Sequence, residues 1–199
     1  MDRDEFNMVM KKYGTVLAVV TGCLMGNAAQ ADNQTVSIGY AQSKVQDFKN
    51  IRGVNVLYRY EWNSPISVLG SFTYMKGSDD YDSNPWPDII KNDIDLKYYS
   101  LLVGPAYCVN DYISLYALGG IAHTKASGSS EWYNHEAGSY HYMGKQSVSE
   151  TSNSFAYGFG FSVNPTDYLA VNVGYEGSKA ELDGNHSING FNVGVGFRF

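Results

Sequence analysis

The sequence predicts an all-β fold: a closed, eight-stranded antiparallel β-barrel that spans a membrane. Eight segments alternate apolar residues with small or polar ones, which is the period-two pattern of a strand with one apolar face. The apolar positions are unusually aromatic, and the chain ends at Phe199 inside such a segment. The composition of the 199 residues agrees, because 17 Tyr and 21 Gly suit strands and tight turns better than helices.

The alternation is clearest between Thr151 and Asn164, where Phe155, Tyr157 and Phe159 share one face with Phe161 and Val163. It is weaker in two segments, because Leu102 and Leu118 fall on the polar face. The eight expected strands are Val36–Ala41, Val54–Glu61, Ile66–Tyr74, Asp95–Cys108, Ile113–Thr124, Thr151–Asn164, Leu169–Glu176 and Phe191–Phe199.

Alternation alone does not distinguish a soluble barrel or sandwich, with its apolar face inside, from a membrane barrel with that face towards lipid. Tyr and Phe near the strand ends favour the membrane barrel, whose interfaces carry aromatic girdles. The opposite face is mainly Gly, Ala and Ser, which suits a narrow interior. A strand edge left open in lipid would cost several kcal/mol for each exposed backbone group, so the strands are expected to close. Eight strands enclose a space that side chains fill, so we expect no pore.

Residues 1–31 are expected to be an N-terminal extension and cleavable signal peptide, and residues 32–199 the barrel domain. Lys11 and Lys12 precede the apolar stretch Tyr13–Met25, and Ala29-Gln30-Ala31 has the small-x-small pattern of a cleavage site. Two alternatives stay open: the chain could start at Met1, Met8 or Met10, and Cys23 lies in a sequence that resembles a lipoprotein processing site.

Cleavage after Ala31 removes Cys23 and leaves Cys108 as the single cysteine, so no internal disulfide is expected. The removed segment has equal numbers of acidic and basic residues, and the mature chain therefore keeps the net charge of −6. This charge argues against general nucleic-acid binding.

Four charged residues fall on the faces expected to point inward: Arg59, Glu61, Glu176 and Arg198. Two acids and two bases compensate one another in number, whereas an unpaired charge in that interior would be costly. We interpret the four as a structural ion-pair network and not as a catalytic or conducting group.

The connections alternate in length. Three are short and rich in turn residues: Trp62–Pro65, Asn110–Asp111 and Pro165–Asp167. Four are longer: Ser43–Arg52, Lys76–Asn92, Lys125–Glu150 and Lys179–His186. In membrane barrels the short turns are periplasmic and the long loops extracellular.

The long loops hold the candidate ligand-binding residues, because exposed aromatics beside polar groups are typical of protein-binding surfaces. The candidates are Trp86, Trp132, Tyr133, Tyr140, Tyr142, Lys44 and Lys49. The alternative is that these aromatics belong to the outer girdle or pack on one another. The acidic run Asp79-Asp80-Tyr81-Asp82 lacks the spacing of a calcium loop and is interpreted as solvated, so no metal site is expected.

Four stretches resemble the Ail/OmpX/PagC/Lom family of Gram-negative outer-membrane proteins: Gly53–Glu61, Leu69–Tyr74, Tyr98–Tyr107 and Gly190–Phe199. The resemblance implies a barrel in the outer membrane, among outer-membrane lipid and lipopolysaccharide, with protruding loops. It also implies adhesion, host-cell entry and serum or complement resistance. Host extracellular-matrix proteins, such as fibronectin and laminin, and complement-regulatory proteins are the implied partners. The acidic second loop departs from the basic loops of the family's adhesins.

Two other functional classes remain. An OmpX-like structural or stress-related barrel would have no dedicated ligand. An enzyme would need a nucleophile and a base within reach. The sequence offers only His123 and Ser127, about 13 Å apart on one face of a strand, so we expect no catalytic residues and no cofactor. Because closure leaves no free edge, a monomer is expected.

Overall fold

The computed structural model describes residues 33–46, 48–83, 89–136, 139–181 and 184–199, and eight strands occupy nearly all of them. The strands are β1 Asn33–Val45, β2 Asn50–Glu61, β3 Ile66–Ser83, β4 Ile89–Cys108, β5 Ile113–Glu136, β6 Ser139–Thr166, β7 Leu169–Glu181 and β8 Asn185–Arg198. The described residues contain no helix that is long and apolar enough to cross a membrane. The expected signal peptide lies outside the described residues.

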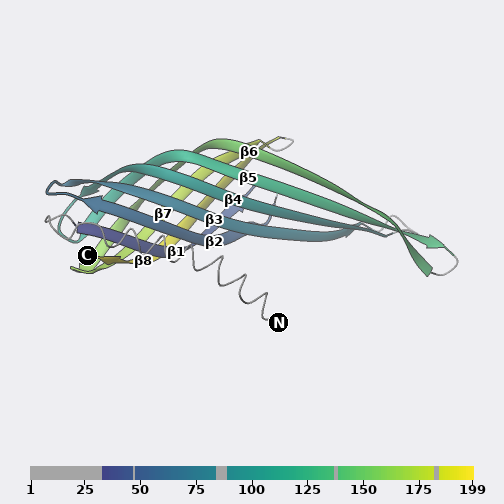
Figure 1. Ribbon diagram of the computed structural model, residues 1–199, viewed down its shortest axis with the longest axis horizontal. Helices are drawn as coiled ribbons and strands as arrows, with labels where there is room; N and C mark the ends of the chain where they lie inside the picture. The colour runs from purple at the N-terminus through teal and green to yellow at the C-terminus, as the bar shows by residue number, and fades with distance from the viewer. Residues whose placement is uncertain (1–32, 47, 84–88, 137–138, 182–183) are drawn as a thin grey trace, which may run out of the picture. The chain divides into compact units, whose positions relative to one another are not determined.

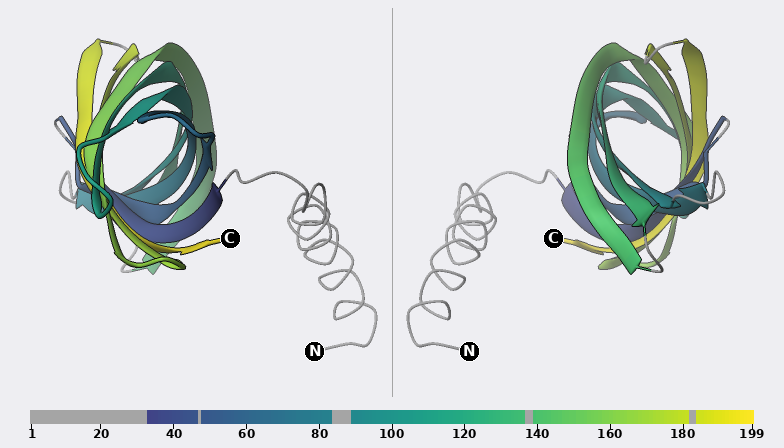
Figure 2. Two further views of the ribbon diagram at one scale, coloured as in Figure 1. Left: turned by 90° about the vertical axis from the view of Figure 1, so that its left-hand side faces the viewer. Right: turned by 90° about the vertical axis from the view of Figure 1, so that its right-hand side faces the viewer.

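Each strand pairs antiparallel with its neighbour in the sequence, and β1 pairs with β8 to close the ring (Figures 1 and 2). At the closure Tyr40 of β1 lies opposite Val54 of β2 on one side and Val193 of β8 on the other. The predicted closed, eight-stranded antiparallel barrel is therefore confirmed.

The barrel carries its large apolar side chains on the outside. Phe155 is 70% exposed, Ile121 67% and Ile38 62%, whereas the neighbouring Ala156 and Ala122 are buried. Such exposure of aromatic and aliphatic groups would be unfavourable in water but is what the lipid-facing side of a membrane barrel requires. The apolar faces predicted from the alternation thus face the hydrocarbon.

Side chains fill the interior. Leu57, Leu69, Met75 and Leu102 are buried inside with polar residues such as Asn55. Leu102 and Leu118, which weakened the alternation, belong to this interior. The filled interior is that of an eight-stranded barrel.

The prediction that Lys76–Asn92 and Lys125–Glu150 are loops is wrong, because most of both segments is strand. The β3–β4 ladder continues to Ser83↔Ile90, and the β5–β6 ladder continues to Glu136↔Ser139. Beyond the membrane both faces of a sheet meet water, so polar residues occur at odd and even positions alike. The alternation of apolar and polar residues that would indicate a strand is therefore absent there. The other two expected loops are also shorter, since β1 ends at Val45 and β8 begins at Asn185.

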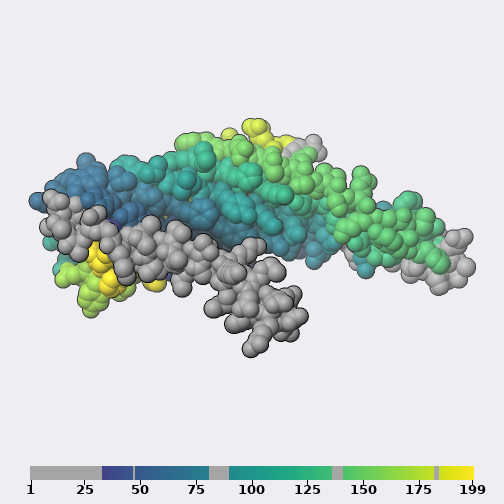
Figure 3. Space-filling model, viewed as in Figure 1, coloured from purple at the N-terminus to yellow at the C-terminus, as the bar shows by residue number. Residues whose placement is uncertain are grey.

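We call the prolonged part of the four central strands the distal sheet. It comprises residues 77–83 of β3, 89–96 of β4, 126–136 of β5 and 139–150 of β6. Figures 1 and 3 show it tapering away from the barrel, with β5 and β6 reaching farthest. The short turns lie at the other end, where the Asn110 carboxamide oxygen accepts hydrogen bonds from the backbone N–H groups of Tyr112 and Ile113.

Candidate binding surface

The interior charges form two separate groups, and the first contains Arg59, Glu61 and Arg198. Arg59 Nη2 lies 3.0 Å from Glu61 Oε1, and Arg198 Nε lies 3.0 Å from Glu61 Oε2. Arg59 also donates hydrogen bonds to Ser67 and Ser114. Its remaining contact is with Cys108, whose Sγ lies 3.1 Å from Nη2. One carboxylate therefore bridges two guanidinium groups, and two hydroxyls and one thiol accept further hydrogen bonds from Arg59.

Glu176 does not join this group. Its carboxylate accepts hydrogen bonds from the Thr73 hydroxyl at 2.8 Å and the Tyr98 hydroxyl at 2.7 Å. Within the described part of the chain no ion pair links it to a cation. The structure thus brings together three of the four expected members, and Glu176 is held by hydroxyl groups.

A cluster of aromatic and charged residues lies on the outward face of the distal sheet. The rings of Tyr133 on β5 and Tyr142 on β6 meet edge to face, with centroids 5.6 Å apart. The Tyr133 hydroxyl donates to Glu131 at 3.1 Å, and Lys145 Nζ donates to the same carboxylate at 3.1 Å. Lys91 Nζ on β4 lies 5.4 Å from the centre of the Tyr133 ring, within cation–π range. We call these five residues the Tyr133 cluster.

A β-bulge places Tyr142 opposite Tyr133. The β5–β6 register shifts between Trp132, paired with Gly144, and Tyr133, paired with Tyr142, so Met143 has no partner. Gly144 has φ of +154°, a conformation that favours glycine. Without the bulge the residue opposite Tyr133 would be Met143.

The charged members of the Tyr133 cluster perturb one another. The hydrogen bond from Lys145 lowers the pKa of the Glu131 carboxyl below its ordinary value, and the Tyr133 hydroxyl adds to this effect. The hydrogen bond to Glu131 raises the pKa of Lys145 and that of Tyr133. All three shifts favour the charge state in which carboxylate, ammonium and neutral phenol are linked.

Trp132 is a neighbour of Tyr133 in sequence but not on the surface. Successive residues of a strand point to opposite faces, so Trp132 lies on the other face of the distal sheet, where it pairs with Ile90. Its side chain is 49% exposed. The adjacent candidates Trp132 and Tyr133 therefore belong to different surfaces of the distal sheet.

The other candidates do not join the Tyr133 cluster. Lys49 forms an ion pair with Asp79, which raises the pKa of the Lys49 ammonium, and Lys44 is exposed on β1. Trp86 lies outside the described residues. Tyr140 is described only by its backbone, which pairs with His135.

The acidic run divides between two faces, since Asp79 and Asp80 are successive residues of β3. Over the described ranges no three His, Cys, Asp or Glu residues come together to hold a metal ion. The imidazole of His123 contacts Asn153, with Nδ1 and Oδ1 2.7 Å apart. Ser127 instead contacts Ser149, with the two Oγ atoms 3.5 Å apart.

Sequence reasoning missed three members of the Tyr133 cluster: Lys91, Glu131 and Lys145. They lay in two segments expected to be loops, and their proximity follows from the strand register, in which Lys91 is opposite Glu131 and Glu131 opposite Lys145. The local signal was the two-residue spacing of Glu131 and Tyr133, which places both on one face if the segment is a strand.

Comparisons with known proteins agree with this architecture. A sequence model described as "Enterobacterial Ail/Lom protein" matches residues 10–199. The virulence membrane protein PagC of Salmonella typhimurium is 45% identical over 187 residues, covering 93% of this chain and 97% of PagC. Outer membrane protein X of Escherichia coli K12 is 35% identical, covering 96% of this chain and all of that protein.

A solved structure is also similar: Ail, the attachment invasion locus protein of Yersinia pestis, in complex with the heparin analogue sucrose octasulfate. It is 33% identical, with a TM-score of 0.64, and the match covers 84% of this chain and 99% of that structure.

Proposed function

Because the chain belongs to the Ail/Lom family of enterobacterial outer-membrane proteins, we propose that it is a host-contact protein whose distal sheet binds host macromolecules. It is a β-barrel of the Gram-negative outer membrane and not an enzyme. We infer that the distal sheet is extracellular and that the short turns at the other end are periplasmic. Adhesion, host-cell entry and serum or complement resistance are the activities that such binding would serve.

The observation that carries the proposal is the Tyr133 cluster. It lies beyond the membrane on the part of the chain that reaches farthest from the barrel (Figure 1). Tyrosines with few rotatable bonds, fixed beside paired charges, are typical of residues that dominate binding energy in protein interfaces. The bulge and the Glu131 hydrogen bonds hold these groups in place before a ligand arrives, which lowers the entropic cost of binding.

We infer a ligand among the host extracellular-matrix and complement-regulatory proteins. Support comes from the relatives, which include a virulence membrane protein and an attachment invasion locus protein. The complex of Ail with a heparin analogue suggests sulfated polysaccharide as another ligand of the same host surfaces. The Tyr133 cluster, with two lysines and one glutamate, favours a protein with mixed charge.

The alternative function is a structural barrel without a dedicated ligand, and one observation favours it. The chain is as similar to outer membrane protein X as to the Ail protein of Yersinia pseudotuberculosis, at 35% identity to each. The family relationship by itself therefore does not select between the two functions.

The deciding experiment measures attachment of bacteria that display the protein to surfaces coated with fibronectin, laminin or a complement regulator. The Tyr133→Ala/Tyr142→Ala double variant is compared with Trp132→Ala, which alters the opposite face of the sheet. Tyr168→Ala is the control, since Tyr168 is an exposed tyrosine in the short β6–β7 turn at the other end of the barrel.

We expect the double variant to bind at least about 30-fold more weakly, as loss of about 2 kcal/mol at a hot spot implies. Tyr168→Ala should bind like the unaltered protein. Loss confined to Trp132→Ala would move the site to the other face. No attachment above empty cells to any coating would leave the structural barrel as the better account.

A further inference from the structure

Glu176 is a buried acidic residue that has no cationic side chain beside it among the described residues. The two arginines of the interior, Arg59 and Arg198, both pair with Glu61 instead. Buried charges in proteins are normally paired or bound to a metal ion, because the loss of hydration of an isolated charge is costly. The charge of Glu176 is therefore one that a bound cation would compensate.

The hydrogen bonds at Glu176 are those of a carboxylate. Asn55 Nδ2 donates to Thr73 Oγ1 at 3.0 Å, so the hydroxyl hydrogen of Thr73 is directed at Glu176 Oε2. The Tyr98 hydroxyl donates to Oε1 at 2.7 Å. Both oxygens of Glu176 thus act as acceptors, which is the role of an ionised carboxyl group.

Three buried hydroxyl groups in the described part of the barrel have no hydrogen-bond partner. They belong to Ser100 on β4, Thr124 on β5 and Ser178 on β7. The three residues are 3%, 0% and 4% exposed. Because nearly all buried polar groups of native proteins are hydrogen-bonded, hydroxyls without a partner indicate a ligand, an ion or a water molecule.

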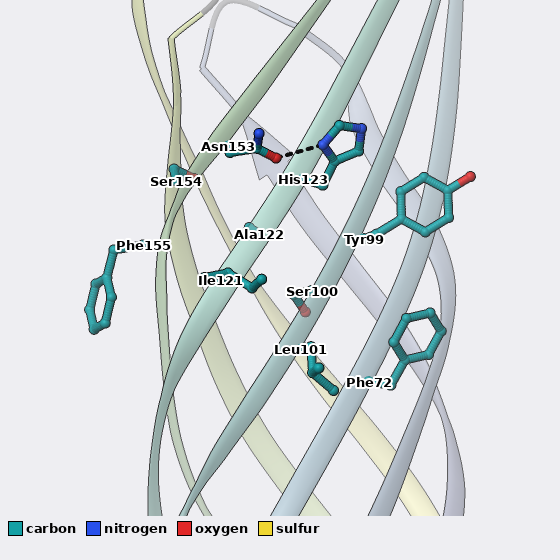
Figure 4. A pocket seen from close by; sticks show the side chains of 10 residues that line it. All are labelled: Phe72, Tyr99, Ser100, Leu101, Ile121, Ala122, His123, Asn153, Ser154 and Phe155. Atoms are coloured by element: carbon teal, nitrogen blue, oxygen red, sulfur yellow. Dashed lines mark hydrogen bonds between the residues drawn. The ribbon is translucent and has the colours of Figure 1, made fainter.

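The strand register brings two of these hydroxyls to the groups that hold Glu176. Ser100 lies opposite Thr73, and Thr124 lies opposite Tyr98. Opposite residues of paired strands share a face, so all four side chains belong to the interior. Figure 4 shows Ser100 between Tyr99 and Leu101, its exposed neighbours on the outer face of β4.

Ser178 reaches the same place from β7, since it is two residues from Glu176 and therefore on the same face of that strand. The hydroxyls of Ser100 and Ser178 both lie next to that of Tyr98, but neither forms a hydrogen bond of proper geometry with it. One carboxylate and two hydroxyl oxygens without partners thus surround a single phenol hydroxyl.

The cross-strand neighbours of the two serines are alanines. Ala122 of β5 lies opposite Ser100, and Ala156 of β6 lies opposite Ser178. A methyl group neither donates nor accepts a hydrogen bond, and it extends only one carbon from the strand. These neighbours therefore leave both serine hydroxyls available to a small ligand.

We propose that the barrel interior binds one alkali-metal cation, such as Na⁺, between the carboxylate of Glu176 and the hydroxyl oxygens of Ser100 and Ser178. Oxygen atoms are the ligands that hard cations prefer. One carboxylate balances one positive charge, whereas Ca²⁺ would leave an excess positive charge inside the barrel. A water molecule would satisfy the hydroxyls but not the charge of Glu176. The proposal is independent of the host ligand.

The ion would link β4 and β7, which are not neighbours in the ring. These ligands come together only in the folded barrel, so binding of the ion would contribute to the free energy of folding. The stability of the barrel should therefore depend on Na⁺ itself and not only on ionic strength.

The test measures urea unfolding of the full barrel in vesicles at constant ionic strength, with Na⁺ replaced stepwise by the large organic cation N-methylglucamine. Glu176→Gln removes the charge and nearly keeps the shape of the side chain. Ser178→Ala removes one proposed ligand. Glu181→Gln is the matched control, because Glu181 is an exposed glutamate on the same strand. Crystals of the unaltered protein and of Glu176→Gln, soaked in Tl⁺, locate the site by anomalous scattering.

Above the Kd for Na⁺, the folding constant of the unaltered barrel and of Glu181→Gln should rise about tenfold for each tenfold rise in Na⁺. Glu176→Gln should show no such rise, and Ser178→Ala should need at least about tenfold more Na⁺. Tl⁺ should lie beside Glu176 in the unaltered protein alone. An equal Na⁺ response in Glu176→Gln would overturn the proposal, as would a flat response of the unaltered barrel with no Tl⁺ at Glu176. A response to Ca²⁺ in place of Na⁺ would overturn the choice of a monovalent ion.

Discussion

Lys145 on β6 and Glu131 on β5 form an ion pair across the distal sheet, with Nζ and Oε1 3.1 Å apart. The pair also receives the Tyr133 hydroxyl, so three side chains meet at one carboxylate.

This pair predicts how the Tyr133 cluster responds to pH. The pKa of Glu131 is lowered from 4.5, so its contribution is present above pH 4.5 and is lost as pH falls through the lowered value. The pKa of Lys145 is raised from 10.5, so its contribution is present below pH 10.5 and is lost as pH rises through the raised value. NMR titration of the Tyr133 and Tyr142 amides should show one conformation between these limits. In Glu131→Gln the lysine should titrate at lower pH, and an unchanged midpoint would mean that the pair does not form in solution.

Because the interior charges form two separate groups, replacing Glu61 or Glu176 by Gln should lower the free energy of unfolding by different amounts. Glu61→Gln should destabilise the barrel by about 3–5 kcal/mol, because two guanidinium groups lose their shared carboxylate. Glu176→Gln keeps an oxygen acceptor but can accept fully from only one of Thr73 and Tyr98. It should cost less, about 1–2 kcal/mol. Urea unfolding of barrels refolded in vesicles measures both. Equal costs would indicate that all four charges act as one network.

Two glycines on adjacent strands predict opposite tolerance to alanine. A Cβ on Gly104 would overlap the backbone of Ala117 on β5, which cannot move without disturbing the ladder. A Cβ on Gly70 would meet nothing nearer than the Leu102 carbonyl oxygen at 3.9 Å. Gly104→Ala should therefore lower the free energy of unfolding by about 1–3 kcal/mol, while Gly70→Ala should leave it nearly unchanged. The same urea experiment provides the comparison, and a tolerant Gly104 would show that the strands can separate locally.

The N-terminal segment predicts the mass of the mature protein. With cleavage after Ala31 the mature chain begins at Asp32 and contains one thiol, that of Cys108. Intact-mass measurement and thiol labelling of protein from outer membranes test both statements. A mature chain that begins at Cys23 and carries acyl groups would establish the lipoprotein alternative instead.

Particular residues show how far the sequence reached. The run from Phe155 to Val163 predicted a strand and its lipid-facing side, because a side chain's face depends only on odd or even position along the strand. The same rule placed Arg59, Glu61 and Arg198 inside. It could not show that Glu176 accepts hydrogen bonds from Thr73 and Tyr98, because these two residues come from strands distant in sequence. Burial was therefore predictable and pairing was not.

The site was predicted less completely for the same reason. Tyr133 and Tyr142 were recognised as exposed aromatics, yet their contact depends on a bulge at Gly144. Lys91, Glu131 and Lys145 belong to three different strands and become neighbours only through the register of those strands.

The sequence by itself determined that this chain forms eight strands with an apolar outer face. The alternation of apolar and polar side chains is a property of each strand alone and does not depend on which strand it pairs with. The tertiary structure decided how far the strands continue past the membrane, which face Trp132 and Tyr133 each occupy, and which charges meet. Those properties depend on register, which turns, bulges and ring closure set over the whole barrel, and a shift of one residue would reverse every face.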